Sequence, residues 1–134
     1  MIPEFDEKGQ LPPGIHLATI DEIIERFGHG SEEREAGSQS IHWLIPMCKR
    51  AGIARVIING SFVTDCRNPR DVDCILVPGV GFEPDSDAAM AIEIGLPYLS
   101  IQIVETQQDY AFYVEEFFSF DRNGRSKGLV EILL

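Results

Sequence analysis

Two apolar runs in the middle of the chain restrict the possible fold more than any other feature of the sequence. Residues 53–58 include three consecutive branched apolar side chains, and residues 71–77 carry apolar side chains on both faces of an extended chain. A strand that is apolar on both faces needs cover on both faces, which is typical of a sheet enclosed by helices. The polar segment between the runs, which contains Asn59-Gly60 and Asn68-Pro69, predicts a loop after the first strand.

Helical and extended patterns alternate along the rest of the chain. Thr19 and Glu22 form a capping-box pattern at the start of a predicted helix that Gly28 ends. A second helix is expected over residues 40–52, with Pro46 either bending it or restricting it to the turns around it. The other expected elements are one solvated helical turn over residues 32–35, helices over residues 84–94 and 109–120, and strands over residues 99–105 and 128–134.

These elements fit one domain of the α/β (α+β) class. The chain has 134 residues, which is enough for one hydrophobic core. Residues 1–18 are rich in glycine and proline and have few periodic apolar positions, so we expect them to form an extended N-terminal arm. Residues 19–134 are expected to form a single domain, a small mixed β-sheet of about four strands flanked by helices.

Composition excludes several classes of function. The formal net charge of -11 argues against nucleic acid as the main partner, because nucleic-acid binding draws its affinity from a surplus of Lys and Arg. No apolar run approaches the about 18 to 20 residues that span a bilayer, and the N-terminus lacks the pattern of a secretion signal. A cytoplasmic protein without a membrane partner is therefore expected. The three cysteines show no metal-site spacing and are interpreted as free thiols.

The candidate site lies in the segment that joins the two apolar strands. Gly60 and Ser61 end the first strand, where backbone N–H groups and a hydroxyl suit an anion such as phosphate. Asp71 and Asp73 begin the second, and their spacing of two places both carboxylates on one face. Such carboxylates repel each other unless a divalent cation lies between them, and Mg2+ binds carboxylates together with phosphates and water. Alternatively, the aspartates simply begin a strand after a turn.

The strand, the Gly-Ser pair, nine intervening residues, Asp-Val-Asp and the continuing apolar strand resemble the signature of the nucleotidyltransferase-fold superfamily, which includes polymerase-beta-like enzymes. Residues 11–16, 60–64 and 127–132 are similar to a small bacterial branch of that superfamily. The resemblance implies that Gly60 and Ser61 contact the nucleotide phosphates. It also implies that Asp71 and Asp73 hold two Mg2+ ions in an active enzyme.

The sequence departs from the superfamily at the third carboxylate of the active site. The matching strand carries Ser100 and Gln102 at its middle positions and an acid, Glu105, only at its end. Glu105 is therefore a weak catalytic candidate, and the alternative is a solvent-facing side chain. Arg67 and Arg70 are candidates for binding the triphosphate, although they would serve equally as surface partners of nearby carboxylates.

Two functions follow from the resemblance. The first is a nucleotidyltransferase that moves a nucleoside monophosphate from a nucleoside triphosphate (NTP) to a hydroxyl acceptor with Mg2+. The second is a catalytically reduced module that binds a nucleotide or a protein partner, as in toxin-antitoxin or defence systems. Because the chain is short for this superfamily, a homodimer or a partner chain is expected to complete the acceptor pocket. The sequence contains no motif that identifies the nucleotide or the acceptor.

Overall fold

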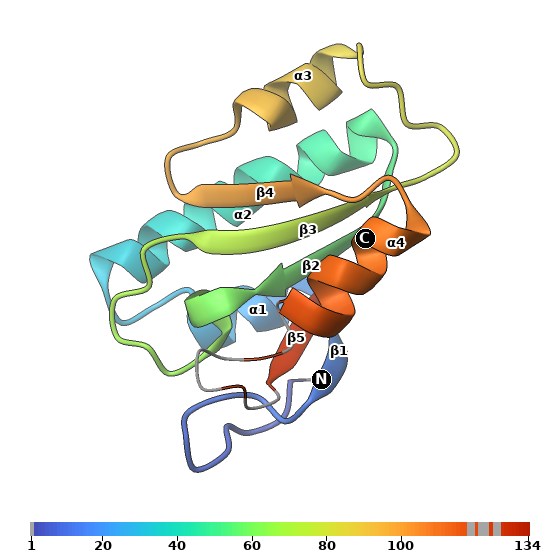
Figure 1. Cartoon of the computed structure of the whole chain (residues 1–134). Helices are drawn as coiled ribbons and strands as arrows, with labels where there is room; N and C mark the ends of the chain where they lie inside the picture. Colours follow the sequence, from blue (N-terminus) through green and yellow to red (C-terminus); the bar gives the residue numbers. More distant parts are fainter. Residues whose placement is uncertain (1, 118–119, 121–123, 125–126) are drawn as a thin grey trace.

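The computed structural model of the chain describes residues 2–117, 120, 124 and 127–134, and these residues form a mixed α+β fold around one five-stranded sheet (Figure 1). The strand order is β1-β5-β2-β3-β4. The strands are β1 (Gly14–Ala18), β2 (Ile53–Asn59), β3 (Val72–Pro78), β4 (Leu99–Ile103) and β5 (Gly128–Ile132). The helices are α1 (Ile20–Phe27), α2 (Glu32–Ala51), α3 (Asp87–Ile94) and α4 (Gln107–Tyr110), which continues as a π-helical segment over Ala111–Phe117.

The sheet contains one strand more than the sequence predicted. Residues 14–18, which were expected to belong to an extended arm, form β1 and pair in parallel with β5 at the other end of the chain. The remaining pairings are antiparallel for β5 with β2 and for β2 with β3, and parallel for β3 with β4. The predicted mixed sheet flanked by helices is confirmed, and its strand count is corrected from about four to five.

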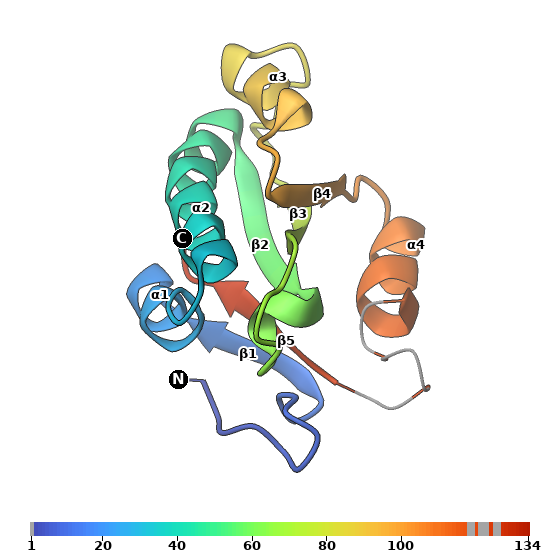
Figure 2. The same ribbon diagram turned by 90° about the vertical axis from the view of Figure 1, so that its left-hand side faces the viewer.

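Helices cover both faces of the sheet, as the two apolar runs predicted. Helices α1 and α2 pack on one face, and α4 packs on the other (Figure 2). Alternate residues of the central strands divide between two buried clusters: Val56 and Ile58 face α1 and α2, whereas Ile57 faces α4. In β3, Cys74 belongs to the first cluster and Ile75 to the second. This alternation means that Asp73 and Asn59 point toward the α4 face.

Local sequence signals explain where most helices begin. Thr19 caps α1 with both hydrogen bonds of a capping box, as predicted. Helix α3 begins at Asp87 because Ser86 caps it, three residues after the predicted start. Helix α4 begins at Gln107 after the Thr106 cap. The end of the helix predicted over residues 109–120 includes residues 118–119, which lie outside the described part of the chain.

Helix α2 begins eight residues before the predicted start. Ser31 accepts a hydrogen bond from the Arg34 N–H at 3.1 Å and caps it, so residues 32–35 form its first turn rather than a separate one. Glu32 and Glu35 are exposed as expected, but Arg34 is buried. Pro46 lies inside the helix. None of the helices in the described ranges is long and apolar enough to cross a bilayer.

Candidate functional site

The predicted site forms where β2 ends and β3 begins, side by side in the sheet. Strand β2 ends at Asn59, and Gly60–Val63 form a single 3-10 turn. The chain then returns through residues 64–71 to β3, in which Asp73 lies directly opposite Asn59. Asp73 is also paired in register with Ser100 of β4. Asn59, Asp73 and Ser100 therefore form a row across three strands, which we call the polar row.

Residue 60 must be glycine for two reasons, its backbone conformation and the closeness of Asp73. Its φ of 77° lies in the left-handed region that side chains strongly disfavour. The space that a Cβ would take is occupied by the Asp73 carboxylate, with Oδ2 nearest. The backbone at Gly60-Ser61 therefore approaches the carboxylate closely, as a site that holds both a phosphate and a metal ion requires.

The charge of Asp73 is destabilised by its surroundings. Burial, reinforced by the charge of Asp71, raises the pKa of the Asp73 carboxyl, while Lys127 and a hydrogen bond from Ser100 act in the opposite direction. Asp71 itself is exposed and immediately precedes β3. A divalent cation between the two carboxylates would relieve their repulsion. The pair fits Mg2+ as carboxylate ligands that leave other positions for phosphates and water.

The described residues contain no group of three or more His, Cys, Asp or Glu side chains that could hold a metal ion. A cation at Asp71 and Asp73 would thus need oxygen ligands from a bound phosphate or from water. This donor set suits Mg2+, which keeps several of its waters, better than a structural metal such as zinc.

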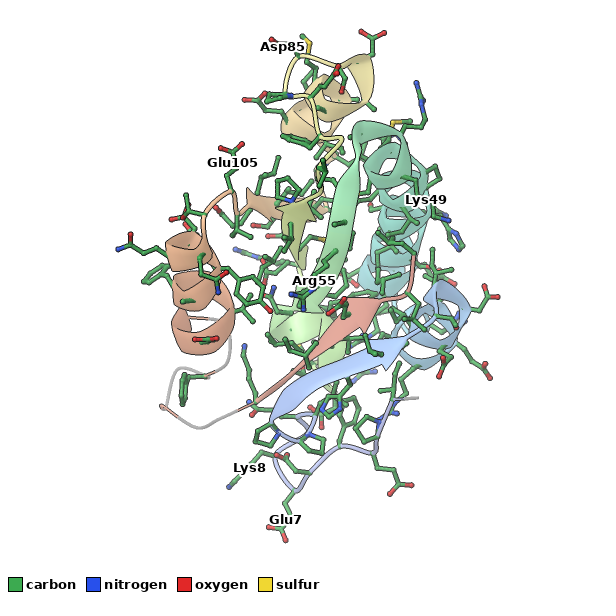
Figure 3. The ribbon with its side chains drawn as sticks, turned by 90° about the vertical axis from the view of Figure 1, so that its right-hand side faces the viewer. Glu7, Lys8, Lys49, Arg55, Asp85 and Glu105 are labelled. Atoms are coloured by element: carbon green, nitrogen blue, oxygen red, sulfur yellow. The ribbon has the colours of Figure 1, made fainter. Side chains whose placement is uncertain are left out.

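Glu105 is not brought to the aspartates. Strands β3 and β4 run parallel with Asp73 beside Ser100, so Glu105 lies five residues further along, roughly 16 Å away at the usual rise of a strand. It is exposed between β4 and α4 (Figure 3). There it lines a cavity of about 510 Å³ together with Arg55 and Tyr110. Ser100, by contrast, occupies the position beside Asp73.

The Arg55 side chain that lines the cavity at Glu105 is already engaged by other residues. The Arg55 guanidinium donates to both carboxylate oxygens of Glu131, the shortest contact being 2.7 Å, and also to the Tyr110 hydroxyl at 3.0 Å. Figure 3 shows Arg55 between the sheet and α4. This cluster ties β2, β5 and α4 together at the end of the sheet opposite Asp73, so we interpret it as structural.

The two arginines that were predicted to bind the triphosphate, Arg67 and Arg70, lie in different parts of the structure. Arg70 is exposed immediately before Asp71. Arg67 is also exposed, but it lines a different cavity together with Arg26 and Arg34. Neither Arg67 nor Arg70 forms an ion pair with another residue of the described ranges, so the alternative role as surface partners has no support there.

Asn59 is a candidate that the sequence did not single out. Its side chain is fully buried, and both amide atoms lack a hydrogen-bond partner among the described residues. Such a buried polar group costs roughly 1–3 kcal/mol, so stability alone does not favour it. Its position in the polar row beside Asp73 was visible only in the register of β2 and β3.

Arg34 is the second residue that sequence reasoning missed. Its guanidinium donates to four backbone carbonyls, at 2.9 Å to Phe27 and Phe62, 2.7 Å to Thr64 and 2.5 Å to Cys66. It therefore fixes the path of the loop that leads from Gly60 toward Asp71. The capping position of Ser31, three residues earlier, was the available signal that residue 34 belongs to the first turn of the long helix and not to a separate solvated turn.

Comparison with known proteins gives one relationship. Residues 3–133 match the DUF6932 family, which is described as a family of unknown function. No curated protein and no solved structure matches the chain.

Proposed function

The chain belongs to the DUF6932 family, and we propose that it is a nucleotidyltransferase-like domain that binds an NTP with Mg2+ but lacks the third carboxylate used in transfer. The observation that carries this proposal is the polar row. Ser100 stands beside Asp73 on the neighbouring strand, where the resemblance leads us to expect an acid, and Glu105 lies beyond the far end of that strand. Binding is therefore favoured over turnover.

The order of elements supports the resemblance on which the proposal rests. Helix α2, strand β2, the turn at Gly60, strand β3, helix α3 and strand β4 follow one another as the resemblance leads us to expect. The close approach of Gly60 to Asp73 supports it independently, because a backbone phosphate cradle and a metal ligand must adjoin to hold one metal-bound triphosphate.

Five residues of the site have a defined role in this proposal. The backbone of Gly60 and Ser61 contacts the terminal phosphates, and Asp71 and Asp73 hold Mg2+ together with phosphate oxygens. When bound, Mg2+ neutralises the charge of the triphosphate, which the two carboxylates would otherwise repel. Ser100 orients the Asp73 carboxylate through its hydrogen bond. Because NTPs are cytoplasmic ligands, the proposal also places the protein in the cytoplasm.

Nucleotidyl transfer is the second candidate function, and the intact Asp71 and Asp73 pair favours it. In that case two Mg2+ ions would act, and the missing acid would come from a partner chain or a second copy of this chain. Light scattering that shows a dimer would support the second-copy version, whereas a monomer at all concentrations would contradict it.

Calorimetric titration tests the proposal. The four NTPs are titrated with and without Mg2+ into the wild type, into an Asp71→Asn, Asp73→Asn variant, and into Asp85→Asn as a matched control in an exposed loop. We expect Mg2+-dependent binding in the wild type and the control, and its loss in the double variant. Equal binding by the double variant would overturn the proposal. Pyrophosphate release by the wild type would instead support the transfer reaction.

A further inference from the structure

We propose a second anion-binding site, separate from the aspartates, that takes a small molecule bearing a phosphate monoester. The site is a cavity of about 390 Å³ whose lining includes Arg26, His29, Arg34, Cys66 and Arg67, and we call it the arginine cavity. Its residues come from the N-terminal segment, α1, the α1–α2 connection, the start of α2 and the loop after Gly60–Val63. Its volume lies within the range of ordinary small-molecule sites.

The distribution of charge sets this cavity apart from the rest of the molecule. The chain has a net charge of -11, and residues 71–121 contain 11 of its 22 acidic residues and no Lys or Arg. The arginine cavity nevertheless gathers three of the chain's 11 Lys and Arg residues. Repulsion among these cations opposes their concentration, and a bound anion would relieve it.

Arg34 and Arg26 are held in place before any ligand binds. Arg34 is fixed by four hydrogen bonds from its Nη1 and Nη2 groups to backbone carbonyls, and no carboxylate of the described residues forms an ion pair with it, so it contributes mainly its positive charge to the cavity. Arg26 stacks over the Phe5 ring at 4.5 Å and lies 5.6 Å from the Phe27 ring. Stacking uses the flat faces of a guanidinium and leaves the N–H groups in its plane for a ligand.

Arg67 and His29 supply the adaptable part of the site. Both side chains are exposed, and neither forms a hydrogen bond or an ion pair within the described ranges. The guanidinium of Arg67 is therefore available to bind a phosphate through two parallel hydrogen bonds. We accordingly assign Arg67 to this cavity in place of its predicted role at the NTP of the aspartate site.

One carboxylate opposes this charge but does not cancel it. Asp65 also lines the cavity, and its carboxyl group lies against the Cα of Gly9, where it would overlap any Cβ at that position. The Asp65 N–H donates to the Gly9 carbonyl at 2.9 Å, which fixes the residue on the N-terminal segment. Three arginines against one aspartate leave a net positive charge that suits a dianion.

The reactivity of the Cys66 thiol can report directly whether a ligand occupies the arginine cavity. Cys48 and Cys74 are buried, and burial raises the pKa of Cys48 to about 12 and that of Cys74 well above its usual value. Both therefore stay protonated and shielded from alkylating reagents. Cys66 is partly exposed and lines the arginine cavity. A ligand bound there should slow the alkylation of this thiol.

The test measures the alkylation rate of Cys66 by iodoacetamide while ribose 5-phosphate or inorganic phosphate is titrated. Sodium chloride at matched ionic strength and succinate, a dicarboxylate, serve as controls. We expect saturable protection by both phosphate compounds and little by either control. The Arg67→Gln variant should weaken the apparent affinity about tenfold or more, because it removes a charge-assisted contact. Arg50→Gln, which removes an exposed arginine from the last turn of α2, should leave the affinity unchanged.

Three outcomes would overturn this inference. They are the absence of saturable protection, equal protection by succinate, and an unchanged affinity in Arg67→Gln. The Asp71→Asn, Asp73→Asn variant separates this site from the proposed function, since it should lose Mg2+-dependent NTP binding but keep the protection of Cys66. Loss of both would show that the two sites are one and would contradict the proposal.

Discussion

At the scale of single residues, the candidate site combines groups that reduce the stability of the fold. Asp73 carries a raised pKa because it is partly buried beside Asp71, and Asn59 is buried without a hydrogen-bond partner among the described residues. Groups of this kind are typical of ligand-binding sites, where a bound ligand compensates for their cost to folding. Replacing them should therefore weaken ligand binding without lowering the free energy of unfolding.

Replacing Asp73 by Asn should stabilise the protein at neutral pH. The folded state binds the Asp73 proton more tightly than the unfolded chain does, so stability falls as the pH rises from the unfolded pKa of about 3.9 through the raised folded pKa. The charge is absent in Asp73→Asn, and we expect a higher free energy of unfolding than that of the wild type at pH 7. Thermal melts from pH 3 to pH 8 should show the gain disappear in acid. Asp85→Asn should show no such pattern, and a destabilised Asp73→Asn at pH 7 would contradict this prediction.

Replacing Asn59 by Leu should preserve or raise the free energy of unfolding. Leu keeps the branching and the number of side-chain heavy atoms of Asn, although its methyl groups make it larger, and it removes a buried donor and acceptor that the described residues leave unpaired, which is worth about 1 kcal/mol. Urea denaturation measures the change, with the exposed Asn68→Leu as the matched control. A loss of more than about 2 kcal/mol would mean that the amide has a partner in the folded protein.

At the scale of secondary-structure elements, the path of the loop after β2 depends on the first half of α2. Arg34 holds the loop through its carbonyl contacts, and Gly37 allows the helix to approach it. A Cβ at Gly37 would lie 2.7 Å from Phe62 Cε1 and 2.9 Å from Val72 Cγ2. The helix therefore packs directly against the turn and the start of β3, which carry the site.

Substituting Gly37 by Ala should destabilise the protein, although alanine is the better helix former. The added methyl group would push Phe62 and Val72 apart, and overpacking of this kind costs roughly 1–3 kcal/mol. Gly81→Ala is the control, because no atom lies within 4 Å of the new Cβ there. Chemical denaturation of both variants provides the comparison, and a Gly37→Ala protein as stable as its control would disprove the close packing.

Elements with strong local signals were predictable from the sequence. The capping box of Thr19 and Glu22 located α1, and the apolar runs located β2 and β3. Strand β1 was missed because its pairing with β5 depends on a segment more than one hundred residues away. The start of α2 was missed because Gly37 is typical of a loop, whereas here it serves close packing.

The candidate site was predictable only in part. The spacing of Asp71 and Asp73 indicated a carboxylate pair, and the structure places them where β3 begins, as predicted. The burial of Asn59, the backbone contacts of Arg34 and the separation of Arg67 from Arg70 depend on strand register and tertiary packing. No local pattern encodes such contacts, so these residues required the structure.

At the scale of the whole molecule, the basic residues are unevenly distributed along the chain, because residues 71–121 contain none of them. The acidic segment of residues 71–121 includes both aspartates of the candidate site, while the arginine cavity is formed by residues that precede it. A free NTP is a polyanion and is repelled by the acidic segment, so NTP binding there should depend strictly on a divalent cation. Without a divalent cation, we expect no NTP binding at Asp71 and Asp73.

Paramagnetic NMR with Mn2+ in place of Mg2+ tests that claim most directly. With an NTP present, we expect Mn2+ to broaden the amide signals of Gly60, Ser61, Asp73 and Ser100 first, and to leave those of Glu105 and Tyr110 sharp. The Asp71→Asn, Asp73→Asn variant should show no selective broadening. Broadening centred on Glu105, or selective broadening that persists in the double variant, would contradict the account.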